Sequence, residues 1–375
     1  MKLLAFILAC IATALAGCDA RENAASAIAP SSACAAGESR WASAAGRYER
    51  SGQYGAGEGE DLLALGGIAM SGDRVYLLDA GAGSVVVLDG EMRKRTTFGR
   101  AGNGPGELAR STMPTSHGGT QRWIAASGDT VVVFDGERVV FFRADGTPGA
   151  TWSPERVRGS SPMQSRIALA GGEVLFSAGG YDFSRGQGSP VFTLFSTSGA
   201  RPRQVAALPL PKLPGRPPAL SSEQARPRWD ARGDCILLSD GASPSLVRVD
   251  RASGAADTLP LPLPDRAPPP ISDDEQRAAA AAGARGVPEP SAPLRVRDLI
   301  IDPDGTVWIR PIQPDPPIAN GIEVIRINAG SGEAMTDTLP AFPRAFGPPG
   351  TFYAVEATAD GAPLLVRYRL VERQI

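Results

Sequence analysis

The sequence predicts an all-β fold, a six-bladed β-propeller built from four-stranded antiparallel blades. Two segments, 72–98 and 128–152, repeat nearly the same pattern of turn glycine, apolar strand, polar hairpin and second apolar strand. The unit returns four more times, and six copies of one supersecondary unit predict a closed repeat architecture. The 44 glycines and 34 prolines of this 375-residue chain suit the many turns of such a ring.

Each copy contains a glycine that turns the chain between two apolar strands. The six turn glycines are Gly72, Gly128, Gly171, Gly233, Gly305 and Gly350. An apolar segment before each glycine and another after the hairpin extend the copies to four strands. In the first copy we expect these strands at 62–69, 74–79, 85–89 and 94–98. Radial packing of such sheets leaves only short exposed edges.

The two ends of the chain are expected to close the ring. The last copy ends near Leu370 and leaves no room for a fourth strand. Segment 40–50 could supply that strand from the N-terminal side. The sequence therefore predicts a final blade that pairs the two ends of the chain.

The first residues have the pattern of an export signal. Lys2 is followed by an apolar run from Leu3 to Leu15, and Leu15-Ala-Gly-Cys18 resembles a bacterial lipobox, whose cysteine is lipidated. The apolar run is too short to span a bilayer comfortably. We predict a lipoprotein signal at 1–17, lipidation of Cys18, and a bacterial cell-envelope location facing the periplasm or the exterior. The alternative is an ordinary secretory signal, and the choice of inner or outer membrane stays open.

Between the signal and the ring lies a small, polar segment that we expect to act as a flexible tether, at 18–37. The propeller domain is then expected to span 38–375. One insertion in it, at 265–293, carries a helix signal near 272–283. There Ser272 and Glu275 form a capping-box pattern, an alanine run follows, and Gly283 stops it.

The four cysteines give no recognisable disulfide framework. Cys10 leaves with the signal and Cys18 would be acylated. For the other two, Cys34 and Cys235, we expect a loose thiol in the tether and a small buried hydrophobe in a strand. A disulfide between them, formed in the oxidising envelope, is the alternative.

The charge balance excludes nucleic acid as a partner. Without residues 1–17 the chain keeps 37 basic and 40 acidic side chains, because only Lys2 is lost. Binding to a phosphate backbone requires a basic face.

Two runs resemble a known family. Phe98-Gly-Arg-Ala-Gly-Asn-Gly-Pro-Gly-Glu-Leu108 and Asp302-Pro-Asp-Gly-Thr-Val-Trp-Ile-Arg310 resemble segments of bacterial six-bladed β-propeller proteins related to NHL repeats, over about residues 40–371. The resemblance implies a secreted or lipid-anchored propeller and brings no catalytic set. The glycine-rich run lacks the Gly-Lys-Ser/Thr of a phosphate loop, so we predict a tight turn between blades in which Glu107 accepts backbone donors.

Five of the six segments that precede the turn glycines carry an arginine near their start. In a propeller these segments are the innermost strands. The arginines are Arg122, Arg166, Arg228, Arg297 and Arg344. Guanidinium groups converging on one channel mouth would bind carboxylate or phosphate, so we predict an anion site there. The alternative is that they pair with neighbours such as Asp61, Asp230 and Asp298.

Few residues suit catalysis. The single histidine, His117, excludes a three-histidine metal site and leaves one candidate base for a Ser-His-Asp triad, without a Gly-x-Ser-x-Gly elbow. A carboxylate calcium site of the lactonase type would draw on Glu58, Asp61, Asp298 and Asp302, although nothing in their spacing brings them together.

We therefore expect a binding or interaction module rather than an enzyme, with no cofactor and no metal. Its partners would be the membrane, through Cys18, and an anionic small molecule or an envelope protein. The alternative function is a metal-dependent hydrolase of sugar lactones or related esters, using calcium in the channel. A purely structural envelope protein also fits the fold.

Overall fold

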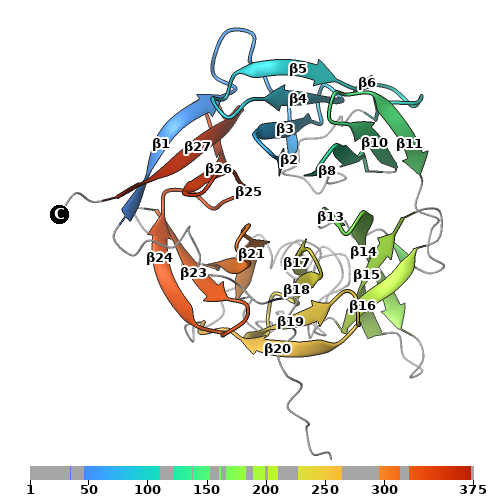
Figure 1. The fold of residues 1–375 in the computed structure, drawn as a ribbon, viewed down its shortest axis with the longest axis vertical. Helices are drawn as coiled ribbons and strands as arrows, with labels where there is room; N and C mark the ends of the chain where they lie inside the picture. The colour runs from blue at the N-terminus through green and yellow to red at the C-terminus, as the bar shows by residue number, and fades with distance from the viewer. Residues whose placement is uncertain are drawn as a thin grey trace, which may run out of the picture. The chain divides into compact units, whose positions relative to one another are not determined.

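The computed structural model describes Cys34 and residues 46–109, 122–136, 138–152, 160–161, 166–182, 189–198, 202–209, 227–263, 295–312 and 321–372. These residues form six antiparallel blades arranged as a ring, which confirms the predicted propeller (Figure 1). Within the described ranges, no helix has the length and hydropathy needed to cross a membrane. Cys18, His117, the signal at 1–17 and the predicted helix near 272–283 lie outside the described residues.

In blades 1 to 5 the strand order follows the chain from the centre of the ring to its rim, and in blade 6 the rim strand is the first strand of the chain. The innermost strands of blades 1 to 6 are β2 (Leu65–Ser71), β8 (Trp123–Ser127), β13 (Ile167–Ala170), β17 (Arg228–Arg232), β21 (Val296–Ile301) and β25 (Ala345–Phe346). The second strands are β3 (Arg74–Asp79), β9 (Thr130–Phe134), β14 (Glu173–Asp182), β18 (Cys235–Ser239), β22 (Thr306–Pro311) and β26 (Thr351–Ala357).

The two outer layers complete the blades. The third strands are β4 (Ser84–Leu88), β10 (Val139–Arg143), β15 (Ser189–Thr197), β19 (Ser245–Asp250), β23 (Ile322–Asn328) and β27 (Pro363–Glu372). The rim strands are β5 (Lys94–Phe98), β11 (Pro148–Trp152), β16 (Arg203–Pro209), β20 (Ala256–Pro260), β24 (Ala334–Leu339) and β1 (Gly46–Tyr54). Short strands are β6 (Arg100–Ala101), which pairs in parallel with β7 (Glu107–Leu108), and β12 (Ser160–Ser161), which pairs with β14.

The two ends of the chain close the ring, as the sequence predicted. The rim strand of blade 6 is β1, which pairs antiparallel with β27 from Gly46 opposite Glu372 to Tyr54 opposite Leu365. In the first blade β3 and β5 have the predicted bounds, whereas β2 spans 65–71 rather than 62–69 and β4 spans 84–88 rather than 85–89.

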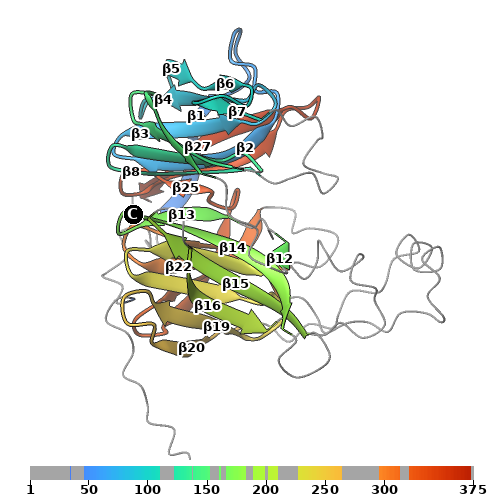
Figure 2. The ribbon, with the colours of Figure 1, turned by 90° about the vertical axis from the view of Figure 1, so that its right-hand side faces the viewer.

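The six turn glycines all have positive φ, from 56° at Gly128 and Gly233 to 87° at Gly305. This left-handed backbone is open to glycine at little steric cost, and it explains why the residue recurs at the end of every inner strand. The inner strands run in one direction, and each ends at its turn glycine. We call the end of the ring that carries these glycines the glycine face, and the opposite end, where the inner strands begin, the arginine face. Figure 2 shows the strands running between the two faces.

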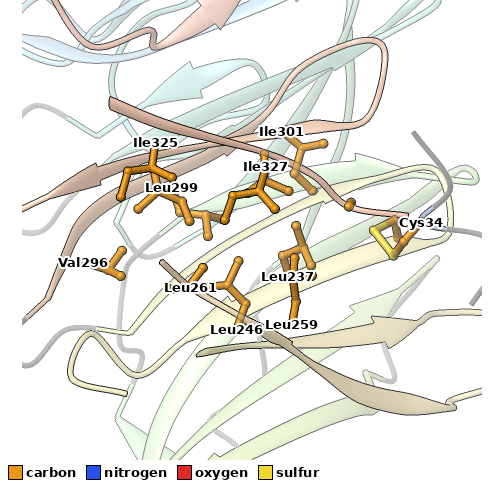
Figure 3. Packing of buried hydrophobic residues seen from close by; sticks show 14 residues of the cluster. Cys34, Leu237, Leu246, Leu259, Leu261, Val296, Leu299, Ile301, Ile325 and Ile327 are labelled. Carbon is orange, nitrogen blue, oxygen red and sulfur yellow. A yellow bond between two sulfur atoms is a disulfide. The ribbon is translucent and has the colours of Figure 1, made fainter. Parts of the chain in front are cut away.

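The hydrophobic core is divided into six clusters, one at each interface between neighbouring blades. Between blades 4 and 5, Leu237 and Leu246 face Leu299 and Ile325 (Figure 3). Burying each such side chain contributes roughly 1.5–3 kcal/mol. The ring is therefore held together between blades, and each blade depends on both neighbours.

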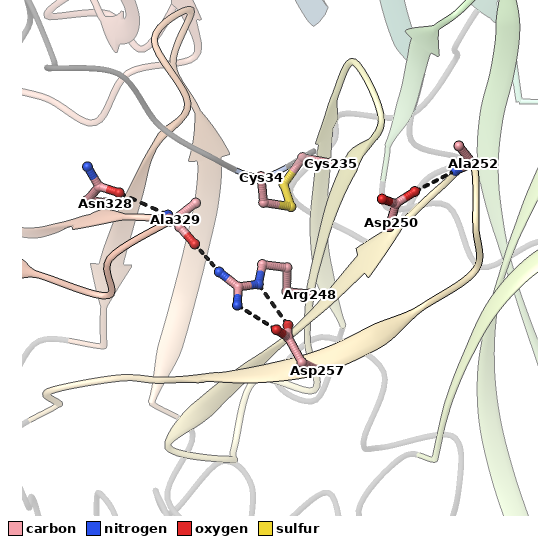
Figure 4. The surroundings of a disulfide bond; sticks show 9 residues. Cys34, Cys235, Arg248, Asp250, Ala252, Asp257, Asn328 and Ala329 are labelled. Carbon is pink, nitrogen blue, oxygen red and sulfur yellow. Dashed lines mark hydrogen bonds and ion pairs between the residues drawn. A yellow bond between two sulfur atoms is a disulfide. The ribbon is translucent and has the colours of Figure 1, made fainter. Parts of the chain in front are cut away.

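Cys34 and Cys235 form a disulfide across a sequence separation of 201, with their Cα atoms 4.8 Å apart (Figure 4). The expectation of two unpaired cysteines is therefore wrong. The spacing of the two residues carried no information, because closure of the ring decides which blade the N-terminal segment reaches. Cys34 is 2% exposed and packs in the cluster between blades 4 and 5. The segment predicted as a tether is thus fastened to β18 at Cys34.

Candidate functional site at the arginine face

The inner strands surround a central cavity of about 1010 Å³. Its charged lining includes Arg122, Arg166, Arg228 and Arg344 at the arginine face, with Asp230 and Asp298. Arg297 does not line the cavity, although it lies in β21 next to Asp298. The structure thus places all five predicted arginines at the same ends of the inner strands, and four of them in the cavity wall.

Arg122 and Arg166 are engaged in links between blades. Arg122 is buried and donates to the carbonyl oxygens of Ala80, in the turn after β3 of blade 1, and of Ala109, in the chain that leads from blade 1 to blade 2. Arg166 lies before β13, pairs through Nε with the Asp230 carboxylate of blade 4 at 3.3 Å, and approaches a carbonyl of blade 5. Both side chains therefore link different blades near the centre of the ring.

Asp230 contacts residues of both neighbouring blades. Its carboxylate accepts the backbone N–H groups of Ala231 at 2.9 Å and Ile301 at 2.8 Å. Burial raises the pKa of Asp230, while the charge of Arg166 and these two hydrogen bonds oppose the rise. Three blades meet at this one side chain. The predicted alternative of arginine pairing is therefore correct for Arg166, and it is also correct for Arg344, which pairs with Asp298.

Positive charge gathers instead beside Asp298, between blades 5 and 6. Arg344 reaches the Asp298 carboxylate at 3.1 Å, and Arg310 of β22 approaches its other oxygen at 3.8 Å. The exposed Arg297 adjoins Asp298 in the chain, and Arg228 donates to the Arg297 carbonyl at 2.6 Å. Two guanidinium groups, from Arg310 and Arg344, therefore share one carboxylate, and the charge of Arg297 acts on Arg310 as well.

The pKa of Arg310 reflects the neighbouring positive charges. Burial lowers the pKa of its guanidinium, the charges of Arg297 and Arg344 lower it further, and Asp298 acts in the opposite direction. Its Nε is buried without a hydrogen-bond partner among the described residues. An added anion would relieve the repulsion, because an opposite charge nearby favours the charged guanidinium.

Blade 5 differs from its neighbours at the arginine-face end of its second strand. In blades 1, 2 and 4 an aspartate follows or ends that strand, and it accepts backbone N–H groups of the next turn: Asp79, Asp135 and Asp240. Blade 5 has Pro311 at the equivalent position. The sheet end that carries Arg310 thus lacks the carboxylate that its counterparts provide.

Sequence reasoning missed Arg310. The signal was present, since a hairpin turning at Gly305 places residues 298 and 310 opposite each other, as the β21–β22 register has them. An arginine and an aspartate in that cross-strand position are expected to interact.

The four acids weighed for a calcium site do not come together. Asp302 is fully buried, where its carboxylate accepts the backbone N–H groups of Asp304 and Thr306 and the Trp308 Nε1–H. Asp298 faces arginines, and neither Glu58 nor Asp61 lines the cavity. Across the described ranges, no group of three or more His, Cys, Asp or Glu side chains is placed to hold a metal.

The glycine-rich run at 99–108 is a tight turn, as predicted. The Glu107 carboxylate accepts the Gly104 N–H at 2.7 Å and the Arg100 Nε–H at 2.7 Å. Arg138 of blade 2 donates to three carbonyls of the run, including Asn103 at 2.7 Å. The run thus connects blades 1 and 2 through hydrogen bonds of its own backbone, while the Arg100 side chain stays exposed.

Comparison with known proteins shows the fold. No family model and no curated protein sequence matches the chain. A member of the DUF4221 family from Bacteroides vulgatus is similar with a TM-score of 0.52 and 9% identity, over 88% of this chain and 97% of that one. A Bacteroides fragilis protein described as exported gives a TM-score of 0.51 and 8% identity, over 86% and 95%. At such identities the similarity is one of architecture: this chain shares the β-propeller fold of bacterial proteins.

Proposed function

We propose that this protein is a lipid-anchored propeller of the bacterial envelope that binds an anionic ligand, a carboxylate or a phosphate, at the arginine face. The observation that carries the proposal is that Arg310 and Arg344 share the single carboxylate of Asp298, while the positive charge of Arg297 also acts on Arg310. Guanidinium groups offer planar pairs of donors that match carboxylate and phosphate oxygens. The relation to NHL repeats stays a prediction.

Three observations support a location outside the cytoplasm. The N-terminal residues have a signal pattern that ends at Cys18. The Cys34–Cys235 disulfide is of a kind that persists in oxidising compartments. One protein of similar fold, from Bacteroides fragilis, is described as exported.

The proposed site would work by adding a second negative group beside a shared counter-ion. Asp298 holds Arg310 and Arg344 in place in the absence of ligand. An anion that docks beside it adds the negative charge that the three arginines lack. Hydrogen bonds to charged groups contribute roughly 1.5–3 kcal/mol each, enough for a measurable affinity from two arginines.

The test is isothermal titration calorimetry with inorganic phosphate and with glucuronate, each at low and at moderate salt concentration. We expect binding that weakens with salt, and a loss of at least tenfold in the double variant Arg297→Gln/Arg344→Gln. Both side chains are exposed, Arg344 at 44%, so the substitutions leave the core intact.

The matched control is Arg232→Gln. Arg232 lines the same cavity, at the glycine face, where its Nε donates to the Pro303 carbonyl at 3.0 Å. Its replacement should leave anion binding unchanged. Binding of neither anion, or an equal loss in the Arg232 variant, would refute the proposed site.

A further inference from the structure

We infer that the anion bound at the arginine face is the C-terminal carboxylate of an extended peptide, and that this peptide adds as a short strand to a free edge of β26 in blade 6. The inference rests on the proposed anion site and names the chemistry of its ligand. It starts from a difference between blade 6 and the two blades beside it.

Blade 6 has the shortest inner strand of the ring. β25 comprises two residues, whereas the inner strands of the other blades have four to seven (Figure 1). β26 is seven residues long, and only Phe352 and Tyr353 of it pair with β25. The end of β26 nearest the arginine face is therefore not paired with an inner strand.

Blades 1 and 5 show which contact blade 6 lacks. The Ala80 N–H donates to the Ala64 carbonyl at 2.7 Å in blade 1, and the Ile312 N–H donates to the Arg295 carbonyl at 3.0 Å in blade 5. Both donors lie two positions beyond the last pair that precedes the register shift at the start of the inner strand. Val355 holds the same place in blade 6, two positions beyond the last pair of β25 with β26.

The backbone groups of Val355 and Ala357 point toward the centre of the ring. The Tyr353 carbonyl accepts the Arg344 N–H at 2.8 Å on that side. Alternate residues of an antiparallel strand direct their N–H and C=O groups to the same neighbour, so Val355 and Ala357 follow Tyr353. Across the part of the chain that the structure describes, these inward groups have no backbone partner. β26 thus presents a free edge at these two residues.

The free edge opens on the central cavity. Val355 and Arg344 both line the cavity, and Val355 is 39% exposed although the first four residues of β26 are buried. Phe342, which precedes β25, packs in the cluster between blades 5 and 6 and does not pair with β26. An exposed strand edge is a template for pairing with another chain, and many proteins bind extended peptides in this way.

The direction of β26 decides which end of a peptide meets the arginines. β26 leaves the glycine face after Gly350 and runs to the arginine face, so an antiparallel peptide would run inward from that face toward β25. Arg344 already occupies the next position along the edge, about 7 Å from Val355. The peptide must therefore end opposite Val355, with its α-carboxylate beside Arg344. A parallel peptide would bring its α-ammonium group to the same guanidinium and would be repelled.

The charges at this point complement a carboxylate. Arg344 is 44% exposed and shares Asp298 with Arg310. A guanidinium group can donate two parallel hydrogen bonds to a carboxylate. The acid of β26 itself, Glu356, accepts the Tyr368 hydroxyl of β27 and is held at that strand. The free edge would bind the main chain of the peptide, and the arginines would select its C-terminal end.

The test is fluorescence anisotropy with the full chain and a hexapeptide, Gly-Ser-Thr-Val-Thr-Val, that carries a dye on its first residue and a free C-terminal carboxylate. The same peptide with a C-terminal amide should bind about tenfold more weakly, because it loses hydrogen bonds to a charged group. A form of the free acid that is N-methylated at its last and third-last residues should bind about fivefold more weakly, because it cannot donate to the edge of β26.

A substitution in β26 tests the same edge from the side of the protein. Val355→Pro removes the inward N–H and leaves the pairing with β27, which uses the alternate residues Ala354 and Glu356. We expect it to weaken binding of the free-acid peptide about fivefold and to leave glucuronate binding unchanged. The matched control, Val355→Ala, keeps the N–H and should bind the peptide within about twofold of the unmodified protein. Circular dichroism and thermal unfolding establish that both variants are folded.

The outcomes separate this inference from the anion site on which it rests. Equal affinity for the free acid and its N-methylated form would overturn strand addition, and equal affinity for the acid and the amide would overturn recognition of the carboxylate. In both cases, glucuronate binding that is lost in Arg297→Gln/Arg344→Gln would leave the anion site standing. If phosphate, glucuronate and the peptide all fail to bind, the anion site itself is refuted.

Discussion

Blades 1 to 3 and blades 4 to 6 join to their neighbours by different means. The equivalent position in the third strand holds Val87, Phe141 and Ser196 in the first half of the ring, and Arg248, Arg326 and Arg367 in the second. All three arginines are buried. The same place in one repeat is thus filled by uncharged side chains in one half and by a buried cation in the other.

Two of the arginines reach into the next blade. Arg248 donates to the carbonyl of Ala329 in blade 5, and Arg367 donates to the carbonyl of Gly90 in blade 1. These carbonyls occupy equivalent turns, one residue after Asn328 and after Asp89. Arg326 has blade 6 as its neighbour, whose outer strands are the two chain ends; it pairs with Asp337 at 3.1 Å and lies over the Trp308 ring at 5.3 Å.

The comparison shows where the third strand itself supplies directional bonds. Blades 1 and 2 meet through apolar contacts such as those of the Phe98 and Phe142 rings, 4.9 Å apart, and their directional bonds come from other strands and loops, namely from Arg122 and Arg138. The half with arginines contains both discontinuities, namely the disulfide to Cys34 and the closure by β1. Hydrogen bonds to carbonyls set the angle between blades, which non-directional apolar contact leaves less defined.

The largest effect is expected from the closing strand. Deletion of residues 38–50 removes half of β1, including Arg47, Glu49 and Arg50, and leaves their pairing positions on β27 without partners. Cooperative thermal unfolding should then be lost, because blade 6 exposes an unpaired edge and its cluster with blade 1 opens. Differential scanning calorimetry measures this, and an unchanged transition would show that the second half of the ring is held without closure.

The next effect is expected from Arg367→Met. Arg367 donates to the Gly90 carbonyl and to the Ser51 carbonyl at 2.9 Å, so it joins β27, β1 and blade 1. Methionine preserves much of the volume but none of the donors, and we expect a loss of about 2–4 kcal/mol in the free energy of unfolding. If the arginine only fills space, as Val87 does, urea unfolding would show a loss of about 1 kcal/mol or less.

A smaller effect is expected from the pair of Arg248 and Asp257. Two guanidinium nitrogens of Arg248 donate to the two carboxylate oxygens of Asp257, at 2.7 and 2.5 Å, in a bidentate ion pair. The hydrogen bond to Asp257 raises the pKa of Arg248. A double-mutant cycle with Arg248→Met and Asp257→Asn should give a coupling energy of about 1–3 kcal/mol. A coupling near zero would mean that the link to Ala329, rather than the ion pair, stabilises blades 4 and 5.

The smallest effect is a pH dependence at the boundary of the two halves. The Ser196 hydroxyl, at 2.5 Å, and the charge of Arg251 hold the pKa of Glu173 below its usual value. Its stabilising contribution, about 1 kcal/mol for this partly exposed carboxylate, is complete above the unfolded pKa and is lost as pH falls through the lower folded pKa. Glu173→Gln should flatten this loss in urea titrations between neutral pH and pH 3. Identical pH profiles for the two proteins would contradict the assignment.

Much of the fold could be predicted because its signals are local. The turn glycines, the alternating apolar strands and the missing fourth strand of the last copy can all be read within one repeat, and each led to the observed blade order. The site was predicted in position only. The start of each inner strand indicated Arg122, Arg166, Arg228, Arg297 and Arg344, but it could not tell which carboxylates or carbonyls each would meet in a neighbouring blade.

The sequence by itself determined six blades, their closure by the two chain ends, and an arginine face opposite a glycine face. Only the tertiary structure decided that Cys34 reaches Cys235, that Arg166 is engaged at Asp230, and that Arg310 joins Arg297 and Arg344 at Asp298. The physical reason is that strand pairing depends on short-range hydrogen bonding and side-chain alternation, which a repeat records. Contacts between blades depend on the angle at which each blade is set in the closed ring, and no single repeat contains it.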